Sequence, residues 1–147
     1  MLKIQAFLLS IIMLLVGVIY GDKPVEIDYI VKINGTEISQ GDNIEVSAEK
    51  DISINCACEN IGRPFKGEDI YYANVSFYKY VNGEKRYLSL SGIVVDAESK
   101  PILIRSGDKF SVSADFSFDS NAEAGVYSME ISVYDCKQIY ENVLTVK

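Results

Sequence analysis

The chain has no histidine and no tryptophan, and its 147 residues include only three prolines and three cysteines. Without histidine it lacks the usual general base of hydrolases and the commonest protein ligand of zinc. Serines are abundant, but nothing in the sequence brings a lysine or a pair of carboxylates to one of them, and no cofactor motif is present. We therefore expect a protein that is not an enzyme and that uses neither a cofactor nor a metal ion.

Positive charge is also scarce. The chain has 14 lysines and arginines against 21 aspartates and glutamates, which gives a formal net charge of −7. Nucleic acids and anionic membrane surfaces repel such a protein. We expect no nucleic-acid partner, and we expect membrane association only through an N-terminal anchor.

The longest apolar run, Ile4–Tyr20, lies directly after Lys3 and is followed by a glycine. A positive charge, an apolar core and a small residue in this order are typical of a secretory signal peptide, here over residues 1–21. An uncleaved anchor is the alternative, because the run is at the short end of the roughly 17 to 25 residues that span a bilayer. Both interpretations place residues 22–147 outside the cell, as one domain that is secreted or held at the extracellular face of the membrane.

Apolar and polar residues alternate repeatedly after the signal, which is typical of strands with one face in a core. The clearest alternations run from Phe110 to Phe118 and from Tyr127 to Val133. Asn-Gly pairs at 34–35 and 82–83 predict tight hairpin turns. The sequence therefore predicts an all-β fold, an antiparallel β-sandwich of about seven to nine strands, preceded by the signal helix.

Four local patterns follow one another along the chain. They are Ile52-x-Ile54-x-Cys56-x-Cys58-Glu59-Asn60-x-Gly62, Val75-x-Phe77-x-Lys79-x-Val81-Asn82-Gly83, Ser106-Gly107-Asp108, and Ala124-Gly125-Val126-Tyr127 leading to Val133-Tyr134-Asp135. In these patterns the chain resembles the cell-adhesion-related domains of bacteria and archaea. Those domains are immunoglobulin-like modules whose second strand ends in Asn-x-Gly and whose sixth begins at Gly-x-Tyr and closes with Asp. The resemblance implies an immunoglobulin-like sandwich.

Immunoglobulin-like domains fold the tyrosine of the sixth strand back onto the preceding corner, so we expect this of Tyr127. The chain departs from antibody domains in having no core tryptophan. It also has Met129 where they carry the cysteine of the sixth strand. An antibody-type disulfide is therefore excluded, while the architecture is retained.

Three cysteines, Cys56, Cys58 and Cys136, predict one disulfide and one free thiol in an exported protein. A bridge between Cys56 and Cys58, two residues apart on one strand, would be strained, so one of them is expected to pair with Cys136. The second and sixth strands of an immunoglobulin-like sandwich end at the same pole, which favours Cys58, although Cys56 stays open as the partner. A metal-thiolate site would lack a fourth ligand.

Two surfaces are candidates for binding. The first is a face of outward tyrosines, Tyr72, Tyr78 and Tyr80, because exposed aromatics with polar tips supply rigid contact area. Ordinary cross-strand packing of tyrosines is the alternative. The sequons at Asn34 and Asn74 are candidate glycosylation sites, and a glycan on Asn74 would hinder binding at this face.

The second surface is the pole formed by the predicted loops 60–69 and 135–142. Rigid sandwiches place recognition in such loops, and this pole offers four anchor-type side chains. They are Arg63, Phe65, Ile139 and Tyr140. A pole without a ligand is the alternative. Immunoglobulin-like inhibitors of cysteine proteases use an Arg-Pro-aromatic loop that residues 63–65 resemble, but there the triplet sits in a different loop, and the companion Asn-Pro and Gly-rich motifs are missing here.

An acidic stretch completes the candidates. Asp115, Asp119, Asn121 and Glu123 space oxygen atoms as calcium loops do, but the glycine turn and the distal glutamate are absent, which favours a solvated loop. The sequence thus predicts an exported, non-catalytic binding or structural module at the cell surface, of adhesion or envelope-assembly type. Its partner is expected to be another extracellular protein or a glycan. The alternative is a loop-borne inhibitor or regulator of an extracellular enzyme.

Overall fold

The computed structural model describes residues 23–67, 73–97 and 103–147. The predicted signal segment and Tyr72 lie outside these ranges. Within them, no helix has the length and apolar character needed to cross a membrane.

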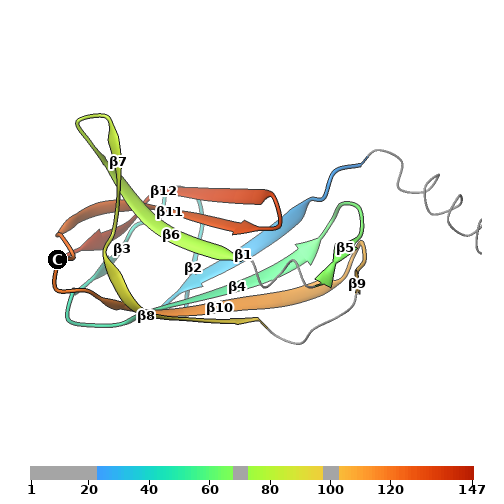
Figure 1. Ribbon diagram of the computed structural model, residues 1–147, viewed down its shortest axis with the longest axis horizontal. Coiled ribbons are helices and arrows are strands. Elements are labelled where there is room, and N and C mark those ends of the chain that lie inside the picture. The colour runs from blue at the N-terminus through green and yellow to red at the C-terminus, as the bar shows by residue number, and fades with distance from the viewer. Residues whose placement is uncertain (1–22, 68–72, 98–102) are drawn as a thin grey trace, which may run out of the picture.

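The described strands form two five-stranded sheets and one small sheet (Figure 1). In spatial order, the first sheet contains β2 (Thr36–Ile38), β1 (Ile27–Ile33), β4 (Ile52–Asn60), β10 (Lys109–Phe118) and β8 (Leu90–Ala97). The second contains β3 (Ile44–Val46), β12 (Cys136–Val146), β11 (Gly125–Val133), β6 (Asn74–Val81) and β7 (Glu84–Tyr87). The small sheet pairs β5 (Phe65–Lys66) with β9 (Leu103–Ile104). Neighbouring strands are antiparallel except β12 and β3, which are parallel.

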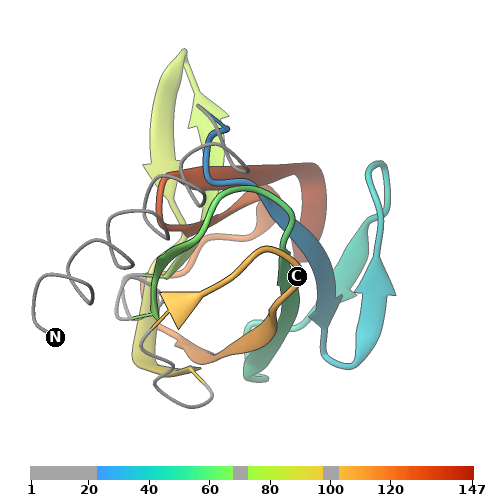
Figure 2. The same ribbon diagram turned by 90° about the vertical axis from the view of Figure 1, so that its right-hand side faces the viewer.

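The alternation seen in the sequence explains how the sheets pack. On β11, Tyr127, Met129, Ile131 and Val133 are each at most 2% exposed, while the residues between them face outward. Figure 2 shows β10 and β12 on opposite sides of the molecule, and the inward residues of both sheets share one core. The all-β prediction is confirmed, and the arrangement is compatible with an immunoglobulin-like sandwich.

Both predicted Asn-Gly turns are present. Asn34 and Asn82 have φ of 49° and 53°, and the glycines that follow them have φ of 81° and 80°. Positive φ at both central residues gives the turn whose twist matches a two-residue hairpin. These turns join β1 to β2 and β6 to β7.

The structure differs from the prediction at the start of β12. Residues 135–142 were expected to form a loop, but only Tyr134 and Asp135 separate β11 from β12. A register shift in the pairing of the two strands, with Asn142 at φ 53°, lets β12 continue to Val146. The described residues also contain more strands than the seven to nine expected. The excess comes from β2, β3, β5 and β9, which are only two or three residues long.

Candidate functional site

The loop that carries Arg63 is fixed by Asn60, the last residue of β4. Asn60 is fully buried. Its Nδ2 donates to the carbonyl oxygens of Arg63 at 3.0 Å and Ile104 at 3.3 Å, and its Oδ1 accepts from the N–H of Gly62 at 3.0 Å. A buried amide whose polar atoms are all satisfied specifies one arrangement of the chain around it. The asparagine of the Asn-x-Gly pattern thus ties this loop to β9.

The same loop lies against the chain that leads into β1. The N–H of Ile61 donates to Glu26 O at 2.9 Å, and the N–H of Arg63 donates to Pro24 O at 3.1 Å. A Cβ on Gly62 would come within 2.4 Å of Pro24 O, so a glycine is required at this close approach. The backbone of Arg63 is therefore held from both sides, while its side chain is exposed.

Phe65 anchors this loop to the core. It is 4% exposed, pairs with Ile104 in the small sheet, and packs edge-on against Phe110 with ring centroids 6.2 Å apart. The expectation that Phe65 offers a free side chain to a partner is wrong in this structure, because its ring packs against Phe110 and Tyr134. Arg63 keeps the exposure that the sequence predicted.

The turn between β11 and β12 brings Tyr134 to Arg63. Tyr134 is half-buried and has φ of 55°, a backbone conformation that costs a residue with a Cβ about 1–2 kcal/mol. Its ring centroid lies 5.5 Å from that of Phe65 and 6.0 Å from Arg63 Cζ. Arg63 Nη2 also donates to Tyr134 Oη at 3.4 Å. Tyr134 is a site residue that the sequence analysis missed, since its Val-Tyr-Asp pattern was interpreted only as the end of a strand.

Tyr29 of β1 holds this turn through two hydrogen bonds of its hydroxyl. Its hydroxyl donates to Cys136 O at 2.9 Å and accepts from the N–H of Val133 at 3.1 Å, so one phenol contacts the chain on both sides of Tyr134. Burial raises the pKa of Tyr29 well above its ordinary value, which keeps the phenol protonated and able to donate. Tyr29 therefore joins the two sheets and holds Tyr134 in its unfavourable conformation.

A pocket of about 420 Å³ opens where these elements meet. It is lined by Arg63, Pro64, Phe65, Lys66, Leu103 and Tyr134. The lining has two positive charges and no negative one, and within residues 23–67, 73–97 and 103–147 neither cation forms an ion pair. Figure 1 shows β5, β9 and the β11–β12 turn at one end of the molecule and the C-terminus at the other. We call the pocket at this end the pole pocket.

The disulfide predicted between Cys58 and Cys136 is not formed, and all three thiols are free. Cys58 Sγ lies 3.8 Å from Cys56 Sγ, whereas Cys136 Sγ contacts Val25 O at 3.2 Å. Tyr29 pairs directly with Cys58, and its hydroxyl donates to the backbone oxygen of Cys136. Each of the two sulfurs thus contacts a group other than its predicted partner. The hydrogen bond with Cys56, together with burial, raises the pKa of Cys58 far above its usual value, which leaves it a neutral packed thiol.

The predicted tyrosine face is a packed cluster on β6 and β7. Tyr78 points outward but is only 6% exposed, because Tyr80 and Tyr87 stack edge-on against it at 5.7 and 6.3 Å, and Lys85 Nζ lies 3.9 Å from its ring centroid. Tyr80 and Tyr87 are 67% and 62% exposed. Cross-strand packing, the alternative left open by the sequence, thus accounts for Tyr78, while Tyr72 lies outside the described residues.

Ile139 and Tyr140 are not part of the pole. Both lie on β12, where Ile139 pairs with Glu130 and is 40% exposed on the outer face of the second sheet. Tyr140 faces the core and is 6% exposed. Tyr140 therefore offers no surface to a partner, since the segment expected to be a loop is a strand.

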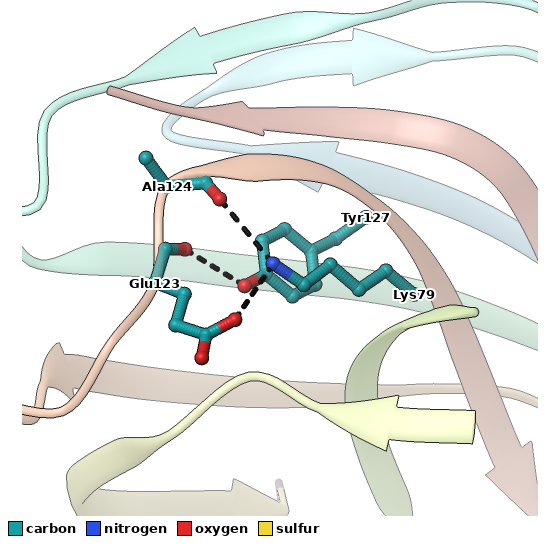
Figure 3. A network of polar contacts seen from close by, with 4 residues as sticks. All are labelled: Lys79, Glu123, Ala124 and Tyr127. Carbon is teal, nitrogen blue, oxygen red and sulfur yellow. Dashed lines mark hydrogen bonds and ion pairs between the residues drawn. The ribbon is translucent and has the colours of Figure 1, made fainter. Parts of the chain in front are cut away.

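The opposite end of β11 contains the expected tyrosine corner (Figure 3). Tyr127 folds back and donates from its hydroxyl to Glu123 O at 2.7 Å. Lys79 Nζ lies 5.0 Å from the ring centroid of Tyr127, 3.0 Å from Glu123 Oε2 and 3.3 Å from Ala124 O. The hydrogen-bonded ion pair raises the pKa of Lys79 and lowers that of Glu123. The two charged groups of this network, Lys79 and Glu123, are paired with each other, so we assign the network a structural role.

The acidic stretch and the sequons show no further site. Glu123 is engaged by Lys79, and Asp119 Oδ1 accepts from the N–H of Asn121 at 2.8 Å. No group of three potential metal ligands of the His, Cys, Asp and Glu types gathers within the part of the chain that the structure describes. Asn34 and Asn74 are exposed, and their glycosylation stays a prediction.

A scan of protein-family models and a search of curated proteins found no match to this chain.

Proposed function

We propose that residues 22–147 form an immunoglobulin-like, non-catalytic module that binds another extracellular protein through the pole pocket. The strand order supports the family of folds, because β1-β4-β10-β8 and β12-β11-β6-β7 correspond to the A-B-E-D and G-F-C-C′ orders of immunoglobulin-like domains. The apolar N-terminal segment with its leading lysine supports export, to the medium or to the extracellular face of the membrane. The net charge of −7 speaks against nucleic acid as the partner.

The observation that carries the proposal is Tyr134. The other three non-glycine residues with positive φ in the described part of the chain are asparagines, which tolerate this conformation at little cost. A tyrosine in a two-residue turn is unfavourable, and such strain persists where the surrounding structure enforces it, often at binding sites. Here it presents a half-buried aromatic ring beside an exposed arginine at the rim of a pocket. Aromatic rings and arginines dominate the binding energy of protein interfaces.

Phe65 argues against the inhibitor alternative. The Arg-Pro-aromatic triplet of the inhibitory loops would have to present its aromatic ring to a protease, but Phe65 is 4% exposed and packs against Phe110 and Tyr134. Binding through Arg63 and Tyr134 is the function we retain.

Site-specific photocrosslinking in the producing cells tests the proposal. Benzoylphenylalanine in place of Leu103, which is 42% exposed at the pole, should give a discrete crosslinked product. The same group in place of Tyr80 tests the tyrosine face, and in place of Val126, which is 45% exposed near the tyrosine corner, it serves as the control. A product from position 80 and none from 103 would move binding to the tyrosine face, and no product from either would show that both placements are wrong.

A further inference from the structure

The two ends of β11 carry the same pair of groups, a tyrosine with a cation against it. At the first end, Lys79 over Tyr127 is completed by the carboxylate of Glu123 at 3.0 Å. At the second end, Arg63 over Tyr134 has no carboxylate among the described residues. Resting on the proposed function, we propose that the partner supplies the missing group, and that the pole pocket binds a carboxylate side chain within an acidic peptide segment.

Arg63 is prepared for such a contact. Its backbone is fixed by hydrogen bonds with Asn60 and Pro24, and its guanidinium donates one hydrogen bond, to Tyr134 Oη at 3.4 Å. Within the described residues the other donors of the planar fork form no hydrogen bond, and two parallel N–H···O bonds to one carboxylate are among the strongest contacts a guanidinium makes. Lys66, also in the lining, adds a second positive charge.

The lining favours a peptide over an acidic sugar. Sugar rings stack on open aromatic faces, but Phe65 is buried and the ring of Tyr134 is already in contact with both Phe65 and Arg63. The exposed apolar surface comes instead from Leu103, which is 42% exposed, and from Pro64. These side chains suit an apolar residue next to the carboxylate in a peptide.

The chain has acids of its own near this point in the sequence, Glu68 and Asp69, which lie outside the described residues. Either would compete with a ligand if it paired with Arg63. The experiment therefore includes a double variant, E68Q/D69N, in which both carboxylates become amides.

NMR titration tests the inference. The ¹⁵N-labelled domain, residues 22–147, is titrated in parallel with the wild-type full chain. The probe is acetyl-Leu-Glu-Leu-amide, and the matched control peptide has Gln in place of Glu. We expect saturable shifts of the Arg63 Nε–H and Tyr134 amide signals with the Glu peptide, and affinity lower by about tenfold or more for the Gln peptide and for Arg63→Gln. Arg86→Gln, which removes an exposed arginine on β7, should bind like the wild type.

Three outcomes would overturn the inference. They are equal affinity for the Glu and Gln peptides, equal affinity of wild type and Arg63→Gln, and a gain of about tenfold or more in E68Q/D69N, which would show that the chain fills its own site. Saturable shifts with glucuronate and none with the Glu peptide would replace the peptide by an acidic sugar. None of these results touches the crosslink from position 103, so the inference can fail while the proposed function stands.

Discussion

Tyr127 and Tyr134 lie at opposite ends of β11 and differ in their exposure and in the pairing of the charge beside them. Tyr127 is 2% exposed, has its hydroxyl satisfied by Glu123, and is covered by a lysine whose charge is paired. Tyr134 is half-buried in a strained turn, beside an arginine whose charge has no partner in the described chain. Closed networks stabilise a fold, whereas groups that are held in place and left unpaired are available to a ligand. We therefore attribute a stabilising role to one end of β11 and propose recognition at the other.

The strongest test of the comparison is Tyr127→Ala. Removing a fully buried ring together with its hydroxyl contact should lower the free energy of unfolding by about 3–5 kcal/mol, measured by urea denaturation. Tyr80→Ala, which removes a ring that is 67% exposed, is the matched control and should change it by less than about 1 kcal/mol. Equal losses in the two variants would contradict the structural role given to the tyrosine corner.

Asn60→Ala should have the next largest effect. It leaves one buried and one partly buried carbonyl oxygen and one N–H without their partner, and we expect a loss of about 2–3 kcal/mol of stability. Peptide affinity should fall as well, since Arg63 loses its support. Asn55→Ala, also on β4, removes a long, exposed hydrogen bond to Ser113 of β10 and should leave both quantities nearly unchanged.

Tyr29→Phe probes the support of the turn through pH. Because the folded pKa of Tyr29 lies above its unfolded value of about 10, its contribution to stability is complete below pH 10 and is lost as the pH rises further. The wild type should therefore lose stability more steeply than Tyr29→Phe above about pH 10. Denaturation curves at a series of alkaline pH values measure the two slopes, and parallel slopes would show that this phenol is not the group responsible.

The smallest expected change in stability belongs to Tyr134→Gly, which separates function from folding. Relief of the positive φ offsets the lost packing against Phe65, so the free energy of unfolding should stay within about 1 kcal/mol of the wild type. Crosslinking from position 103 should nevertheless be lost. A variant that unfolds at much lower urea would contradict the expected offset. One that crosslinks normally would show that Tyr134 is not part of the binding site.

Local signals were enough to predict the parts of the fold set by neighbouring residues. The alternation on β11, the Asn-Gly turns and the folded-back Tyr127 each depend on a few consecutive positions, and each is present. The sheet order depends on pairing between distant strands, and the sequence supplied it only through a resemblance.

The candidate site was predicted in part for the same reason. Arg63 was found because its loop is rich in glycine, proline and charge. Phe65 was expected at the surface because the rings that pack against it, Phe110 and Tyr134, come from segments far along the chain. Tyr134 was missed because tyrosine is not a turn residue, and its conformation is imposed by Tyr29 from the other sheet. The predicted disulfide is absent because Cys58 Sγ lies against Cys56 Sγ and Cys136 Sγ contacts Val25 O.

The contact of the pocket loop with Pro24 and Glu26 has a consequence for how the module is presented. The N-terminal segment joins the domain at the end that carries Arg63 and Tyr134. In a protein that keeps its N-terminal segment in the bilayer, the binding end would be tethered next to the lipid and would meet partners lying close to the same membrane. In a processed protein the same end would be free to face any direction, so a single cleavage would decide the range of partners within reach.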